Sequence, residues 1–82
     1  MIHFAALQSL LFNHLDHLGI DPTDITREAL FTDLGADATD LLDVILAVED
    51  TYSMTIPEDI ADTFTTPGAI HRYLEDTLDP QP

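Results

Sequence analysis

Two histidines and an aspartate near the end of the first apolar segment are the first groups in this chain that could do chemistry. His14 and His17 lie three residues apart and would share one face of a helix, with Asp16 between them. Imidazole and carboxylate groups are common metal ligands. A stable site needs further ligands, however, none is close in sequence, and His3 and His71 add none. We therefore expect no metal site.

Groups for covalent or acid–base catalysis have equally little support. The chain has no cysteine, and its two serines, Ser9 and Ser53, lack the local context of a nucleophile motif. Its 16 aspartates and glutamates are spread along the whole sequence. Paired acids that transfer protons need a cleft that perturbs their pKa values, and a chain of 82 residues offers little of one. We expect a protein that is not an enzyme.

Acidic residues dominate the charge of the chain and narrow the class of partner. The formal net charge is −14, with two arginines and no lysine. Such a charge repels nucleic-acid phosphates and anionic membranes, and it steers the protein toward basic surfaces of other proteins. The run Asp33, Asp37, Asp40 and Asp43 is not a calcium loop, because it lacks the alternating ligands, central glycine and closing glutamate of an EF-hand.

An amphipathic helix is predicted to begin after Asp37 and to continue to Tyr52. The Asp37 carboxylate can accept from the N–H groups of the first turn, and Asp40 places negative charge at the positive end of the helix dipole. Apolar residues then recur three and four apart and form a stripe predicted to face the core: Leu41, Val44, Ile45, Val48 and Tyr52.

The opposite side of this helix carries a second surface. At 100° per residue, two leucines fall there among acidic side chains, with a glutamate at the boundary: Leu42, Asp43, Leu46, Glu49 and Asp50. Exposed leucines alone are unremarkable. Their acidic frame favours a docking ridge for a basic groove on a partner protein.

The segment Phe31 to Pro57 resembles the central segment of acyl carrier proteins, whose hallmark is Asp-Leu-Gly-Ala-Asp-Ser-Leu before an acidic helix and an Ile-Pro pair. Asp33 to Asp37 match this hallmark residue for residue. Further matching positions cover nearly the whole chain: Leu18, Gly19, Ile20, Ile25, Thr26, Glu49, Asp50, Tyr52, Ile56, Pro57, Thr65, Thr66, Ile70, Tyr73 and Leu74. The resemblance implies a small all-α bundle of three longer helices and one short helix.

One departure from the family pattern changes what the resemblance implies. In acyl carrier proteins the serine after this hallmark carries 4′-phosphopantetheine, and Ala38 aligns with it here. Alanine has no oxygen to phosphorylate, so we expect no cofactor on the chain as written. Thr39 follows with a hydroxyl group, but it is turned by about 100° and moved by about 1.5 Å along the helix. Asp37, Ala38 and Thr39 are therefore the residues at the cofactor position, with attachment to Thr39 disfavoured.

Two functional hypotheses follow, and a third, a purely structural acidic bundle or a small enzyme of unrecognised chemistry, has little support. The first is a carrier-like module of fatty-acid or polyketide-type biosynthesis that docks on synthase enzymes through its acidic second helix but cannot be loaded, as a natural variant or a Ser-to-Ala form. The second is a dedicated interaction or regulatory protein that binds a basic groove of an enzyme. Thr39, as a second departure, favours a natural variant over an engineered one.

The remaining elements follow from apolar spacing and capping residues. Residues 2–18 are predicted as the first helix, with Phe4, Leu7, Leu11, Leu15 and Leu18 inward and Gly19 ending it. A long connection, residues 21–35, should be pinned to the core by Ile25, Leu30, Phe31 and Leu34. Pro57 is predicted to open a short helix over 58–63. Thr66 is predicted to cap a last helix that begins at Pro67, whose inward residues are Ile70, Tyr73, Leu74 and Leu78.

The length of the chain and the sequences at its two ends predict its domain organisation and location. We predict one domain over residues 1–78 and a disordered tail over 79–82. There is no basic region followed by an apolar run, and no stretch of about 20 apolar residues. We expect a cytoplasmic protein that is a monomer when alone, and Met1 favours a free-standing chain.

Overall fold

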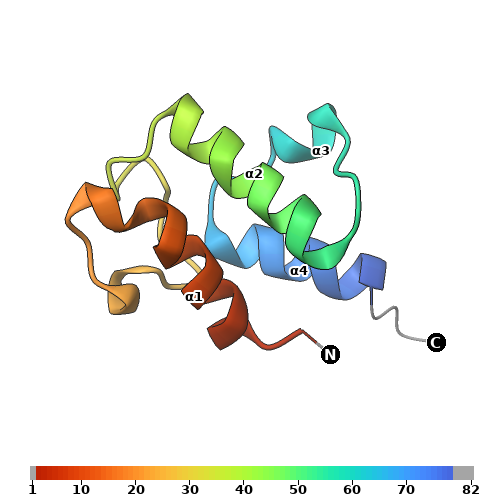
Figure 1. Cartoon of the computed structure of the whole chain (residues 1–82), viewed down its shortest axis with the longest axis horizontal. Coiled ribbons are helices and arrows are strands. Elements are labelled where there is room, and N and C mark those ends of the chain that lie inside the picture. Colours follow the sequence, from red (N-terminus) through yellow and green to blue (C-terminus); the bar gives the residue numbers. More distant parts are fainter. Residues whose placement is uncertain (1, 79–82) are drawn as a thin grey trace.

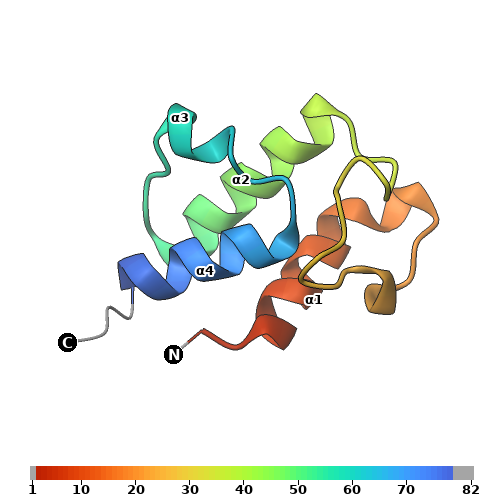
Figure 2. The same cartoon turned by 180° about the vertical axis from the view of Figure 1, so that it is seen from behind.

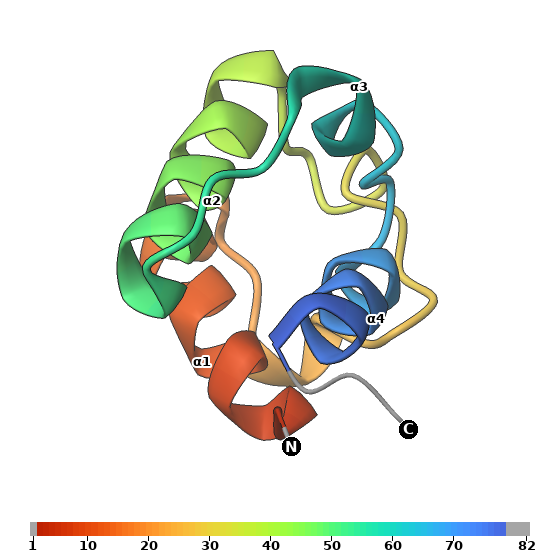
Figure 3. The same cartoon turned by 90° about the vertical axis from the view of Figure 1, so that its right-hand side faces the viewer.

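The computed structural model describes residues 2–78, and within them the chain is helical without a strand. Three longer helices are α1 (Phe4–Leu15), α2 (Ala38–Tyr52) and α4 (Pro67–Leu78), and α3 (Glu58–Ala61) is a short one. Seen from one end, they surround a common interior (Figure 3). The predicted all-α bundle of three longer helices and one short helix is confirmed. The predicted tail, residues 79–82, lies outside the described residues.

The first helix is shorter than the sequence predicted. The prediction of residues 2–18 was wrong at both ends, because α1 spans Phe4–Leu15 and a 3-10 turn follows over Asp16–Leu18. Its start is delayed because His3 is extended, with φ −77° and ψ 131°. At the other end, Gly19 has a φ of 75° and closes the turn, as predicted.

The core is formed by the inward faces of α1, α2 and α4, together with residues of the connections. On α1, Leu7, Leu11 and Leu15 are buried, as the spacing predicted. Burial of an aliphatic side chain of this size stabilises the fold by roughly 1.5–3 kcal/mol. The buried apolar residues outside α1 are Ile25, Phe31, Ala36, Val44, Val48, Ile56, Phe64, Ile70 and Leu74.

The connection from α1 to α2 wraps one end of α1 and passes beside the start of α4 (Figures 1 and 2). Ile25 and Phe31 are buried and Leu34 is half-buried, so these predicted anchors are confirmed. Leu30 was predicted as an anchor and is 43% exposed. This prediction was wrong, because the N–H of Phe31 donates to the carbonyl oxygen of Thr65. That hydrogen bond turns Phe31 toward the core and Leu30 toward solvent.

The connection also lies very close to α4. The N–H of Gly68 donates to the carbonyl oxygen of Arg27 at 3.0 Å. A Cβ atom added to Gly68 would lie 2.6 Å from that oxygen. Only glycine therefore allows the backbone of the connection to approach the first turn of α4 this closely.

The last two helices differ from the predictions in small ways. The helix predicted over 58–63 ends at Ala61. Beyond it, the N–H and the hydroxyl group of Thr63 both donate to the carbonyl oxygen of Ile60, which closes a turn and ends the helix. Thr66 caps α4 as predicted, since its Oγ1 accepts from the N–H of Ala69 at 3.2 Å. Leu78, predicted to face inward, is 40% exposed, because it lies in the last turn of α4, beyond the buried Leu74.

No helix within residues 2–78 is both long enough and apolar enough to cross a membrane.

Candidate functional site

The start of α2 is fixed by two aspartates that bind each other's backbone. The carboxylate of Asp37, the N-cap residue, accepts from the N–H of Asp40 at 2.9 Å. The carboxylate of Asp40 accepts in return from the N–H of Asp37 at 3.0 Å. This reciprocal cap leaves Ala38 as the first residue of the helix, with both Ala38 and Thr39 exposed. The predicted helix start is confirmed.

A histidine from the 3-10 turn after α1 contacts this cap. Nε2 of His17 lies 2.8 Å from Oδ1 of Asp40, although the two residues are 23 positions apart. The hydrogen bond from the Asp37 N–H, with a smaller contribution from His17, holds the pKa of Asp40 below its ordinary value of 3.8. Local spacing contains no signal for this contact, because it depends on how the connection folds back. The spacing of His17 from His14 suggested only a role as a metal ligand.

Within residues 2–78, no three histidine or acidic side chains gather closely enough to hold a metal ion. His14 is half-buried on α1, and His17 turns to Asp40. The hydrogen-bond partner of His17 in the described residues is therefore the α2 cap.

An apolar pocket of about 530 Å³ opens next to Ala38, between α2, α3 and the end of the connection. Its lining includes Leu41 and Ile45 of α2, Phe31 of the connection, and Phe64 from the segment before α4. Leu41 and Ile45 belong to the stripe predicted to face the core. Both are half-buried, because the stripe closes over the core at Val44 and Val48 and borders the pocket at its edge.

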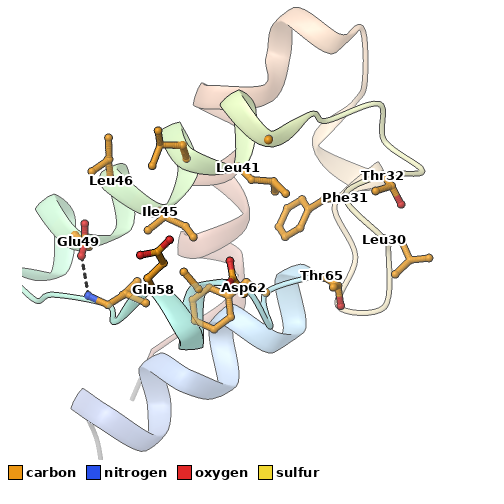
Figure 4. A pocket seen from close by; sticks show the side chains of 15 residues that line it. Leu30, Phe31, Thr32, Leu41, Ile45, Leu46, Glu49, Glu58, Asp62 and Thr65 are labelled. Carbon is orange, nitrogen blue, oxygen red and sulfur yellow. Dashed lines mark hydrogen bonds between the residues drawn. The ribbon is translucent and has the colours of Figure 1, made fainter.

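Three carboxylates lie on the border of this pocket. Glu58 and Asp62 reach from the α3 region toward α2, and Glu49 lies at the far end of the pocket (Figure 4). The pocket is thus an apolar space with an acidic border. Such a border disfavours an anionic occupant and favours a neutral or basic one.

The outer side of α2 presents the surface that the sequence pattern singled out. Leu42 is 57% exposed and Leu46 is 52% exposed, and both lie at the edge of the pocket. Asp43 and Asp50 are exposed beside them. Four of the five predicted docking residues therefore share one solvent-facing side of the helix.

Glu49 differs from the other predicted docking residues. It is half-buried, and its Oε2 accepts from the backbone N–H of Ile56 at 2.7 Å (Figure 4). The carboxylate thereby ties the end of α2 to the segment that leads into α3. Sequence spacing placed Glu49 at the boundary of the docking side, but only the fold gives it a partner.

A comparison with protein-family models adds an independent finding to this geometry. Residues 15–74 match the model described as phosphopantetheine attachment site. The matched range begins in the last turn of α1 and ends in α4, so it includes the α2 cap, the pocket and the exposed side of α2. Because the match covers more than half of the chain, this protein belongs to the phosphopantetheine attachment site family, whose carrier domains bear 4′-phosphopantetheine.

Proposed function

We propose that this member of the carrier family docks on synthase or acyl-processing enzymes through the exposed side of α2 and carries no phosphopantetheine itself. The observation that carries the proposal is the methyl side chain of Ala38. It stands directly after the N-cap of α2, at the position that we align with the attachment serine of the family.

The residues at this position do not fit covalent attachment of the family's cofactor. A phosphodiester needs a side-chain oxygen, and Ala38 has none. Thr39 has an exposed hydroxyl, but it is one residue further along the helix and belongs to a different face. Ala38 borders the apolar pocket. We therefore propose that neither residue holds the cofactor in this chain.

Charge and exposure of α2 support docking. Leu42 and Leu46 offer apolar area that no other part of the described chain covers, and Asp43 and Asp50 flank it. Acidic rim contacts raise the association rate with a basic surface and weaken as salt is added. We assign Glu49 mainly a structural role, because its carboxylate accepts a hydrogen bond from the backbone N–H of Ile56.

The biological setting follows from the family. Carrier domains of this family interact with synthase or acyl-processing enzymes and are generally non-catalytic. On the resemblance to acyl carrier proteins, we place this protein in fatty-acid or polyketide-type biosynthesis, in the cytoplasm, as a monomer until it docks.

Intact-protein mass tests the attachment proposal. The protein and its Ala38→Ser variant are incubated with coenzyme A and a broad-specificity phosphopantetheinyl transferase. We expect the mass of the arm only on the serine variant. Loading of the protein as written would overturn the proposal and direct attention to Thr39. Loading of neither would mean that the recognition surface for the transferase is absent.

The docking surface is tested on the loadable Ala38→Ser background, with the transferase as the partner. Asp43→Lys and Leu46→Ala should each lower kcat/KM for loading about tenfold or more, without loss of helicity. Glu28→Lys is the matched charge control and Leu78→Ala the matched leucine control, because both residues are exposed outside α2. Equal loss in the controls, or none in the α2 variants, would refute docking through this side.

A second function is favoured by the same alanine. If the protein binds its enzyme but is never loaded, it acts as an interaction or regulatory protein that occupies the basic groove. This function predicts that the protein as written inhibits loading of its own serine variant, with an inhibition constant close to the KM of that variant. Absence of inhibition would remove the support for this second function.

A further inference from the structure

Within residues 2–78, His71 is the one polar side chain counted among the buried residues, with 5% of its surface exposed. It lies in the middle of α4 and is not among the residues that line the pocket. Neither the attachment position nor the docking surface uses it.

Both ring nitrogens of His71 have a partner from another part of the chain. Nε2 lies 2.6 Å from the carbonyl oxygen of Ile2, in the segment before α1. Nδ1 lies 2.9 Å from Nη1 of Arg27, in the connection. The ring of Phe4 meets the imidazole edge-on at 5.5 Å, and the Arg27 guanidinium lies 4.5 Å from the centre of the same Phe4 ring.

These partners fix the protonation state of the imidazole. A carbonyl oxygen only accepts hydrogen bonds, so Nε2 of His71 carries a proton and donates it to Ile2. A guanidinium only donates, so Nδ1 must be bare and accept from Arg27. The arrangement therefore requires a neutral imidazole.

A second proton on His71 is incompatible with the bond to Arg27. The new N–H at Nδ1 would face a guanidinium that is always charged, and two cations would meet at hydrogen-bond distance. An alternative acceptor is already close, because Oε1 of Glu75 lies 3.5 Å from Nδ1, one helical turn further along α4. We propose that His71 is a proton-operated clasp, which holds Arg27 when neutral and releases it for Glu75 when protonated.

The groups around the imidazole set the balance between these two states. Arg27, from the connection, opposes the second proton, and Glu75, from α4, favours it. The N-terminal segment and α1 contribute the carbonyl of Ile2 and the ring of Phe4, which do not titrate. The neighbouring residues His3 and Arg72 are exposed. Histidine is the side chain whose ordinary charge change lies nearest to neutral pH, which is why the test below spans neutral and mildly acidic solutions.

Release of Arg27 would reach the pocket through the backbone. The carbonyl of Arg27 accepts from Gly68, and four residues later the N–H of Phe31 donates to the carbonyl of Thr65. Phe31 lines the pocket. The Arg27 side chain thus fastens the same stretch of connection that forms one wall of the pocket, and its release loosens that wall.

Amide hydrogen exchange of Gly68 and Phe31 tests the proposal, because these two N–H groups report the bonds that fasten the connection. Exchange rates are measured by NMR from pH 5.5 to 7.5 and divided by the intrinsic rate at each pH. We expect about tenfold weaker protection at the low end of the range. Protection that does not change between these pH values would overturn the proposal.

Two variants separate the clasp from general effects of acidity. In His71→Gln, the amide group can donate to Ile2 and accept from Arg27 without titrating, so the pH dependence at Gly68 and Phe31 should disappear. In Glu75→Gln, the loss of the alternative acceptor should move the transition to lower pH. His17→Gln is the control, since His17 contacts Asp40, and should leave the transition unchanged. The clasp would be refuted if His71→Gln and Glu75→Gln both kept the same pH dependence of amide exchange as the protein as written. Loss of that pH dependence in His17→Gln would refute it as well.

Discussion

Oε2 of Glu49 accepts a hydrogen bond of 2.7 Å from the backbone N–H of Ile56. This contact closes the turn after α2, where Ser53 adopts a φ of 53° and the N–H of Met54 returns to the carbonyl of Glu49. An acidic residue on the helix that we propose to dock thus has a partner within its own chain. A charge reversal at this position would disturb the fold as well as the proposed docking surface.

Glu49→Ala should lower the free energy of unfolding by about 1–2 kcal/mol, because the buried N–H of Ile56 loses a charged acceptor. Urea unfolding measures this loss, and amide exchange should locate it at Ile56. Asp43→Ala, an exposed acidic residue on the same helix, should change stability little. If the two variants were equally stable, the Glu49–Ile56 bond would contribute nothing to the fold.

Asp37→Ala should lower the free energy of unfolding by about 1 kcal/mol, since it removes the N-cap acceptor for the N–H of Asp40. For a domain of this size, such a loss corresponds to a fall in Tm of about 4–8 °C, which calorimetry can measure. Asp37→Ser should restore most of the stability, because serine also caps helices well. Failure of serine to restore it would point to charge rather than capping.

Asp40 should make stability depend on pH in the acid range. Its pKa in the folded protein lies below the ordinary value of 3.8, so the unfolded chain binds more protons in this interval. The stability that its charge contributes is therefore complete above about pH 4 and is lost as pH falls through the lowered pKa. Unfolding midpoints in urea from pH 5 to pH 2.5 should show a shallower loss for Asp40→Asn than for the protein as written. Asp43→Asn serves as the charge-matched control, and a slope as shallow in this control would assign the effect to net charge.

Gly68→Ala should destabilise the protein by about 1–3 kcal/mol, although alanine is the better helix former. The added Cβ would lie 2.6 Å from the carbonyl oxygen of Arg27, so the connection or α4 must move. Thermal unfolding measures the loss, and Thr77→Ala, at an exposed position in α4, is the control. An unchanged or higher Tm for Gly68→Ala would show that the two segments can separate at no cost.

The helices could be predicted from the sequence because their signals are local. The cap at Asp37, the apolar spacing from Leu41 to Tyr52 and the glycine stop after α1 each depend on residues within one or two helical turns. The predictions that were wrong concern the ends of helices and the edge of the core. Ile2 and His3 were assigned to a helix that they do not enter, and Leu30 and Leu78 were expected inside, because local spacing does not say where a neighbouring segment stops.

The candidate site was predictable to the extent that it lies on one helix. The exposed side of α2 and the position of Ala38 followed from helical geometry and family resemblance. The contacts of His17 with Asp40, Glu49 with Ile56 and His71 with Arg27 join residues that are 23, 7 and 44 positions apart. Such contacts exist only once the connections have folded, so local spacing carries no signal for them.

The backbone hydrogen bonds between the connection and the region of α4 restrict where residues can be inserted in this chain. Residues 21–24 are exposed and form a local 3-10 turn over Pro22–Asp24, whose one hydrogen bond to another element within the described residues is from Gln8 to the carbonyl of Pro22. Added residues there would disturb few contacts and cost little loop-closure entropy. Between Arg27 and Phe31, by contrast, the backbone is bonded at one end to Gly68 of α4 and at the other to Thr65, just before α4, so one inserted residue would put these two bonds out of register. Insertions among related sequences should therefore accumulate at the first of these stretches and be absent from the second.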